Sequence, residues 1–139
     1  MRIVVDTNII IAALIKDSIT RKIIVESGWE FYYPEISIHE IREHKNLILE
    51  KSGLSENEYL ELLKKLLSYI NIVPQEMFFS EMTQAENLIG AYDPDDVVFL
   101  ATALAMHNSI IWSNDPVFSK QGAIKALETK HILIIFQNL

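Results

Sequence analysis

The chain has 139 residues and no cysteine, so it is long enough for one domain with its own core and lacks disulfides and thiolate metal sites. Its formal net charge of −7 argues against broad adhesion to nucleic acid, but a site that recruits divalent cations can still meet phosphate through them. The N-terminus shows no secretory leader and no apolar segment approaches the length of a membrane span, so we expect a soluble, cytoplasmic protein.

The first predicted elements are a buried strand and a helix that follows it directly. The apolar run Ile3–Val5 is typical of a strand covered on both faces of a parallel sheet, and it leads into Asp6, Thr7 and Asn8. A helix is predicted from Ile9 to about Gly28. Asp6 therefore lies at the carboxyl end of a strand, where open α/β sheets bind ligands. The alternative is that one of the three polar residues merely caps the helix.

The middle of the chain alternates short strands with amphipathic helices. Strands are predicted over residues 31–34 and 71–74, and helices over 36–51, 55–70 and 80–89. Ser55 and Glu58 form a capping box at the start of the second of these helices. Its apolar stripe consists of Tyr59, Leu62, Leu63, Leu66, Leu67 and Ile70.

The last third of the chain begins with Asp93 and Pro94, which are typical of the N-cap and first position of a helix. This helix is apolar nearly all round over 97–106 and should be buried on most sides. A strand over 110–112, a short helix over about 119–127 and a strand over 132–136 follow. No linker or repeat interrupts the alternation, so we expect one α/β domain over residues 1–139.

Two of the candidate site residues follow apolar strands. Asp6 ends the first strand and Asp115 follows the strand over 110–112, so their carboxylates converge if these strands are neighbours in a parallel sheet. Oxygen ligands from different segments make a site for a hard cation such as Mg²⁺ or Mn²⁺. Asp115 alternatively begins a turn before Pro116. No dinucleotide-binding or P-loop glycine motif is present.

Two further acids each have a structural alternative. Asp96 completes a capping box with Asp93, although the first turn of a buried helix also stabilises an ionised carboxylate. Glu40 alone is typical of the exposed side of an amphipathic helix. Only the four acids together, Asp6, Glu40, Asp96 and Asp115, favour a shared site.

The layout of the four acids along the chain resembles the PIN-domain family over essentially the whole sequence. Its most specific pieces are Asp-Thr-Asn at 6–8 and Ser-Asn-Asp at 113–115, and its least specific is Glu40. The resemblance implies a three-layer α/β/α fold with a central, mostly parallel sheet of about five strands. It also implies a ribonuclease that uses Mg²⁺ or Mn²⁺ to hydrolyse phosphodiester bonds in RNA.

Carried over position by position, the resemblance gives each residue an expected role. The metal-binding and catalytic set is Asp6, Glu40, Asp96 and Asp115. Asn8 and Ser113 are the expected polar supports of the site loops. The basic residues that could follow the RNA backbone are Arg42, Lys45 and Lys120, although each is also typical of an ordinary solvated charge. Whether Asp93 or Asp95 helps to hold a second ion stays open.

Many members of this family are toxins of VapBC-type toxin–antitoxin pairs, so the resemblance implies a toxin with a small antitoxin protein as partner. The alternatives are a housekeeping RNA-processing nuclease and a catalytically silent module that binds RNA or protein; the four acids favour an enzyme. The helical region 52–70 is expected to touch a partner. We also expect a homodimer, because this stripe and the apolar helix from Val97 offer more apolar surface than one small sheet covers.

Overall fold

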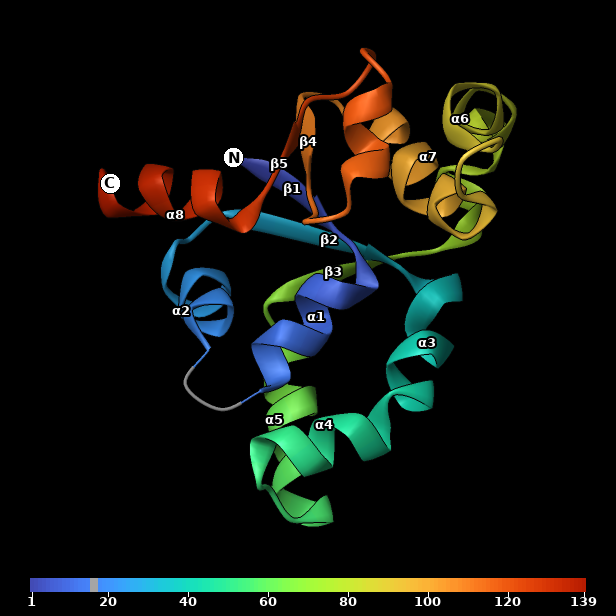
Figure 1. Ribbon diagram of the computed structural model, residues 1–139. Coiled ribbons are helices and arrows are strands. Elements are labelled where there is room, and N and C mark those ends of the chain that lie inside the picture. The colour runs from blue at the N-terminus through green and yellow to red at the C-terminus, as the bar shows by residue number, and fades with distance from the viewer. Residues whose placement is uncertain (16–17) are drawn as a thin grey trace.

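The computed structural model describes residues 1–15 and 18–139. At its centre lies a parallel sheet of five strands in the order β3-β2-β1-β4-β5 (Figure 1). The strands are β1 (Arg2–Val5), β2 (Glu30–Pro34), β3 (Ile70–Val73), β4 (Ser109–Trp112) and β5 (Ala126–Leu127). The expected parallel sheet of about five strands is confirmed.

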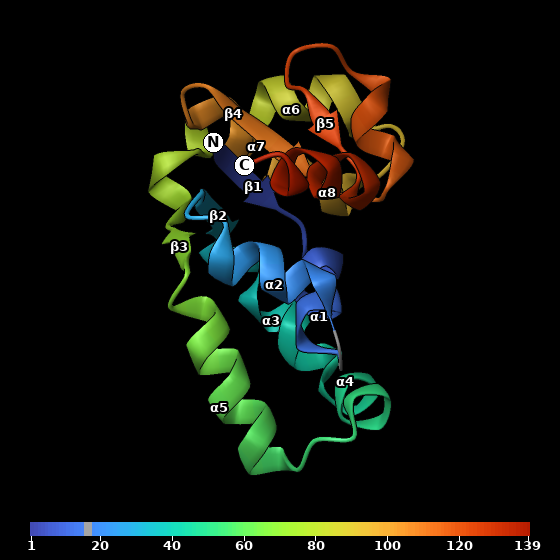
Figure 2. The same cartoon turned by 90° about the vertical axis from the view of Figure 1, so that its left-hand side faces the viewer.

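Eight α-helices of the described residues surround the sheet. They are α1 (Thr7–Leu14), α2 (Ile19–Glu26), α3 (Ile38–Glu43), α4 (Lys45–Ser52), α5 (Glu56–Leu67), α6 (Met82–Ile89), α7 (Val97–Ala105) and α8 (Thr129–Gln137). α7 packs on β1, β2 and β4 with α6 beside it, while α1, α2 and α5 lie on the opposite side (Figures 1 and 2). The three-layer α/β/α arrangement is therefore confirmed. None of the helices in the described part of the chain has the length and apolar character of a membrane span.

The core forms where the sequence is apolar without interruption. Ile3, Val4 and Val5 of β1 are fully buried, as expected for a central strand covered on both faces. α7 is buried on most sides, as predicted, and its Phe99 packs with the ring of Tyr33 from β2 at a centroid distance of 5.9 Å. The first strand and this helix together give the site residues a rigid support.

Two predicted helices are each divided in the structure. The helix expected from Ile9 to about Gly28 is wrong as one element, because α1 ends at Leu14 and Ser18 caps a new helix by accepting from Arg21 N at 3.1 Å. The part of that prediction over residues 16–17 lies outside the described residues. The helix expected over 36–51 is divided at His44, whose backbone leaves the helical conformation.

The C-terminal predictions are wrong in type. Where a helix was expected over 119–127, a 3-10 turn spans Pro116–Lys120 and β5 follows. β5 occupies the edge of the sheet through backbone bonds such as Ser113 N to Leu127 O at 3.1 Å. The apolar run 132–136, predicted as a strand, belongs to α8, which buries Ile132 and leaves Ile134 57% exposed. A short apolar run does not by its period separate a strand from a helix.

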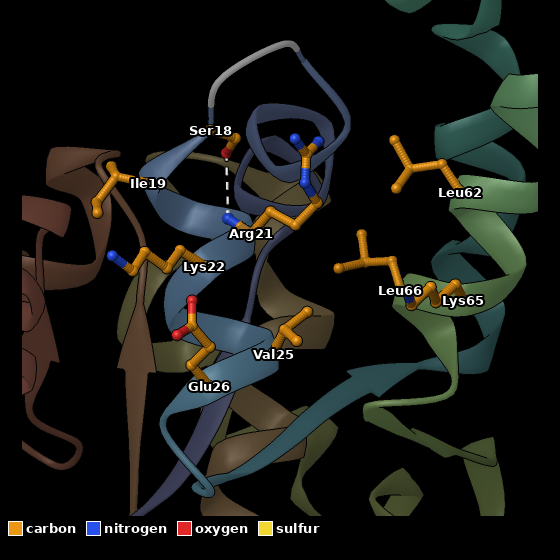
Figure 3. A pocket seen from close by; sticks show the side chains of 9 residues that line it. All are labelled: Ser18, Ile19, Arg21, Lys22, Val25, Glu26, Leu62, Lys65 and Leu66. Carbon is orange, nitrogen blue, oxygen red and sulfur yellow. Dashed lines mark hydrogen bonds between the residues drawn. The ribbon is translucent and has the colours of Figure 1, made fainter.

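The apolar stripe of residues 59–70 is divided between the core and a groove. Tyr59 and Leu66 are buried, and Ile70 belongs to β3. A groove of about 580 Å³ lies between α2 and α5, with Leu62 and Leu66 pointing toward α2 (Figure 3). The basic side chains that line it are Arg21, Lys22 and Lys65. α5 therefore presents a partly basic apolar surface beside α2.

Candidate metal site at the carboxyl ends of β1 and β4

The candidate site lies where the strand order changes direction. β1 pairs with β2 on one side and with β4 on the other, and the register places Val5 opposite Trp112. The residues that follow both strands therefore meet at the carboxyl edge of the sheet, the position at which open α/β sheets bind ligands. β1 and β4 are therefore neighbours in the sheet, which is the condition under which Asp6 and Asp115 were expected to converge.

Asp6 is held by two hydrogen bonds at this edge. Its side chain is only 3% exposed; Oδ1 accepts from Ile9 N at 3.0 Å and Oδ2 accepts a short bond from Ser113 Oγ. Asp6 thus caps α1 and also lies in the candidate site, so the two interpretations of this residue do not exclude each other. The pKa of Asp6 is raised to about 6, mainly by burial and in addition by the negative charges of Asp115 and Glu40, although the two hydrogen bonds lower it.

Ser113 joins the two strand ends. Its buried hydroxyl donates to Asp6 and accepts from Asp115 N at 3.0 Å. Asp115 in turn accepts from Val117 N at 2.9 Å through Oδ1, so the expected turn before the next segment also forms. Asn8 differs from expectation, because its side chain is exposed and takes part in no hydrogen bond among the described residues.

Three carboxylates converge beside this pair of strand ends. One oxygen from each of Asp93, Asp96 and Asp115 lies within 4.8 Å of the others. We call these three residues the carboxylate cluster. Asp93 accepts from Asp95 N at 3.0 Å, so the position of the Asp93 carboxylate is fixed by its own turn. The sequence left the participation of Asp93 open, and the structure brings it to the cluster whereas Asp95 is exposed.

Asp96 does not form the predicted capping box. It precedes α7 without any side-chain capping bond, and its Oδ2 is buried without a hydrogen-bond partner among the described residues. The pKa of Asp96 is raised to about 8, mainly by burial and in addition by the adjacent Asp93 and Asp115, so the neutral form is favoured. A buried carboxylate oxygen normally has a partner, so this atom requires either a proton or a cation.

The donor set fits a hard divalent cation. The cluster offers carboxylate oxygens and neither sulfur nor imidazole, which is the ligand chemistry of Mg²⁺, Mn²⁺ and Ca²⁺. The unpartnered oxygen of Asp96 and the repulsion among three acids are both relieved by a positive charge placed between them. The described residues therefore fit such an ion on chemical grounds.

Glu40, on α3, is linked to the site by a chain of two hydroxyl groups, those of Thr7 and Tyr33. Its Oε2 lies 3.4 Å from Thr7 Oγ1, which is 2.7 Å from Tyr33 Oη, and Tyr33 also donates to Ser37 O at 2.8 Å. Two hydroxyl protons thus serve three contacts, and the long contact to Glu40 is the weakest. Burial raises the pKa of Glu40, although the charge of His39 partly opposes this effect.

Thr7 and Tyr33 were not predicted as site residues. Thr7 stands inside the Asp-Thr-Asn motif and is buried, so the motif itself carried a signal for it. Tyr33 carried none, because an aromatic residue in an apolar strand is typical of a core. A groove of about 430 Å³ approaches the site from outside and is lined by Glu40, Asp95 and the apolar Met82, among others.

The three basic residues expected to follow RNA lie in different surroundings. Arg42 is exposed on α3. Lys45 forms a salt bridge with Glu56 at 3.2 Å, which holds it toward α5. Lys120 ends the turn after Asp115, and its Nζ lies 4.8 Å from the centroid of the Tyr92 ring. Of the three, Lys120 is tied to a residue adjacent in sequence to Asp93.

Comparison with known proteins gives one family. A family model described as a PIN domain matches residues 4–136, a range that contains all five strands except the first two residues of β1. The matched range also contains the carboxylate cluster, Asp6 and Glu40. No curated protein matches the chain.

Proposed function

Because the chain belongs to the PIN-domain family, a family of nucleases, we propose that it is a divalent-metal-dependent endoribonuclease that hydrolyses phosphodiester bonds in RNA. The observation that carries the proposal is the buried, unpartnered oxygen of Asp96 inside the carboxylate cluster. A structural cap explains neither the missing hydrogen bond nor the convergence of three acids from two segments.

Each acid has a role in this proposal. Asp96 and Asp115, joined by Asp93, would hold Mg²⁺ or Mn²⁺, and Asp6 and Glu40 would complete the acidic site. When bound, the ion supplies a water of lowered pKa and neutralises charge on the leaving oxygen. Ser113 orients Asp6 and the backbone of Asp115 together, so both carboxylates keep their places as the substrate arrives.

The residues themselves exclude other routes. Among the described residues the site contains no arrangement of Ser, His and Asp that would supply a protein nucleophile. The cluster and Asp6 repel phosphate unless a cation lies between them. Arg42 and Lys120, both exposed, are the proposed contacts to the RNA backbone, and Lys45 becomes available only when its salt bridge with Glu56 opens.

The first test is cleavage of single-stranded RNA by the purified protein. We expect products with Mg²⁺ or Mn²⁺ and none with EDTA, and we expect Asp115→Asn to be inactive under both conditions. Cleavage that persists in EDTA, or in the Asp115→Asn protein at the wild-type rate, would contradict the proposed mechanism. A panel of RNAs is required, because one resistant RNA does not test a selective enzyme.

We further propose that the protein is the toxin of a VapBC-type pair and that its antitoxin binds the groove between α2 and α5 (Figure 3). Three basic side chains, Arg21, Lys22 and Lys65, line this groove against one acidic side chain, Glu26. In a chain of net charge −7 this local excess of positive charge favours a partner segment that is acidic with apolar anchors. Induced expression should arrest growth, and co-expression of a small neighbouring open reading frame should relieve the arrest.

The two alternatives give different outcomes in the same experiments. A housekeeping RNA-processing nuclease would cleave a defined RNA without arresting growth. A silent module would bind RNA or protein and cleave no RNA with any metal. Lys65→Glu provides the matched control for the antitoxin, since it should prevent the rescue of growth while leaving RNA cleavage unchanged.

A further inference from the structure

An exposed aromatic residue immediately precedes the carboxylate cluster in the sequence. Tyr92 precedes Asp93 and is 61% exposed. The turn that carries it is fixed, because Tyr92 N donates to Ile89 O at 2.9 Å and Asp93 N donates to the same oxygen at 3.1 Å. At Gly90, which caps α6, an added Cβ would lie 2.6 Å from Glu86 O, so the last turn of the helix leaves no room for a side chain there. The ring is thus presented from a defined backbone position.

A lysine from the turn after Asp115 reaches the Tyr92 ring. Lys120 ends the turn that starts after Asp115, and its Nζ lies 4.8 Å from the Tyr92 ring centroid. Lys120 takes part in none of the salt bridges within residues 1–15 and 18–139, although four carboxylates of the site region are close in sequence to it or to Tyr92. The ammonium therefore has no carboxylate partner among the described residues, and its contact there is with one face of the Tyr92 ring.

We propose that Tyr92 and Lys120 bind single-stranded RNA beside the carboxylate cluster, with the ring stacked on a nucleobase and the ammonium on a neighbouring phosphate. An aromatic face next to a cation is the combination that binds single strands without dependence on base identity. A base paired in a duplex has no free face for the ring, so the pair selects unpaired RNA. This inference rests on the proposed function only in taking RNA as the substrate.

The test compares binding and catalysis in matched variants. Tyr92→Ala should raise KM for a single-stranded RNA by about 5- to 160-fold, the loss expected for one stacked base, with little change in kcat. Tyr92→Phe keeps the ring and should behave as wild type. The control is Tyr69→Ala, because Tyr69 is 40% exposed but precedes β3 at the opposite edge of the parallel sheet.

Binding is measured separately by fluorescence anisotropy with a labelled oligouridylate, its duplex with oligoadenylate, and Ca²⁺ as the cation. Tyr92→Ala should weaken binding of the single strand and leave the duplex unchanged. Lys120→Gln should reduce the slope of log affinity against log salt by about 0.7, the value for one phosphate on a single strand. Thermal melts of all variants verify that the fold is intact.

The outcomes separate this inference from the proposed function. If wild type cleaves RNA but Tyr92→Ala leaves both KM and oligouridylate binding unchanged, the inference is overturned and the nuclease proposal stands; the ring would then serve another contact, such as a protein partner. If no RNA is cleaved but oligouridylate binding depends on Tyr92 and Lys120, the inference stands and the nuclease proposal fails.

Discussion

Replacing Asp96 tests whether this single residue is a metal ligand or a helix cap. Asn retains the shape of Asp and lacks its charge, so Asp96→Asn should leave the metal-free protein as stable as wild type or more stable, since three carboxylates within 4.8 Å repel one another. The rise in melting temperature with Mg²⁺ or Mn²⁺ should shrink, and RNA cleavage should fall. Thermal melts with and without metal, together with a cleavage assay, measure all three.

The matched control is Asp95→Asn. Asp95 is adjacent and exposed and lies outside the carboxylate cluster, so its replacement should leave the metal-induced shift unchanged. An Asp96→Asn protein that keeps both its metal-induced shift and its cleavage rate would show that the carboxylate cluster is not the metal site.

The pH dependence of stability follows from the raised pKa values. Asp6 and Asp96 have pKa values of about 6 and about 8 in the folded protein. An unperturbed aspartate has a pKa of about 3.9, so the folded state binds more protons than the unfolded state between these values. Their contribution to the free energy of unfolding is complete below about pH 4 and is lost as pH rises to about 8. For Asp6 it amounts to at most about 3 kcal/mol.

The measurement is urea denaturation in EDTA across this pH range, for wild type and Asp96→Asn. The variant cannot titrate at position 96, so its stability should gain relative to wild type as pH rises from about 4 to about 8. Added Mg²⁺ should restore wild-type stability most at the high end of the range, where the carboxylates are ionised. A stability difference that does not change with pH would contradict the raised pKa of Asp96.

Thr7 and Tyr33 should shift the ionisation of Glu40 in opposite directions. Tyr33→Phe releases the Thr7 proton to Glu40 and should lower the pKa of that carboxyl, whereas Thr7→Val removes the donor and should raise it. The acid limb of the cleavage-rate profile should move to lower pH in the first variant and to higher pH in the second.

Tyr32→Phe is the control for this pair, because its hydroxyl contacts Arg2 and Glu30 at the other end of the strand. It should leave the acid limb in place. Tyr33→Phe also deprives buried Ser37 O of a donor, so a loss of about 1–3 kcal/mol in stability is expected beside the pH effect. If Tyr33→Phe and Thr7→Val move the acid limb in the same direction, the two hydroxyl protons are not shared among the three contacts as described.

At the scale of the element, the capping box of α5 is the most local prediction. Ser55 Oγ accepts from Glu58 N at 3.2 Å and the Glu58 side chain accepts from Ser55 N at 3.0 Å, as the sequence predicted. Ser55→Ala should lower the free energy of unfolding by about 1 kcal/mol. Asn57→Ala, an exposed change in the same turn, should not lower it. Equal effects of the two changes would assign the stability to helix propensity instead.

Elements were predictable where the signal was local or strongly periodic. β1, the cap of α5 and buried α7 needed only a short window of sequence. α8 was not predictable in the same way, because the apolar run 132–136 suits a strand and a helix equally. The position beside β4 at the edge of the sheet is occupied by β5. The same distinction applies to the site residues. Asp6 and Ser113 were predictable because they follow strands, whereas the proximity of Asp93 to Asp115 depends on tertiary packing.

The homodimer remains a prediction, but the surface that would form its interface differs from the one expected from the sequence. α7 is buried on most sides within the chain and offers little surface, so exposed apolar side chains such as Leu60, Phe79 and Ile134 would have to form the interface. Light scattering at tens of micromolar should give twice the chain mass of 16.0 kDa. A single species at the chain mass would contradict the dimer.

The hydrogen bond between Ser113 and Asp6 joins residues that are 107 positions apart, and it forms only after β4 has paired with β1. A ribosome that is still translating this chain therefore carries Asp6 without its counterpart, and Asp115 has yet to be added. The proposed metal site is therefore incomplete until Asp115 has been synthesised and β4 has paired with β1.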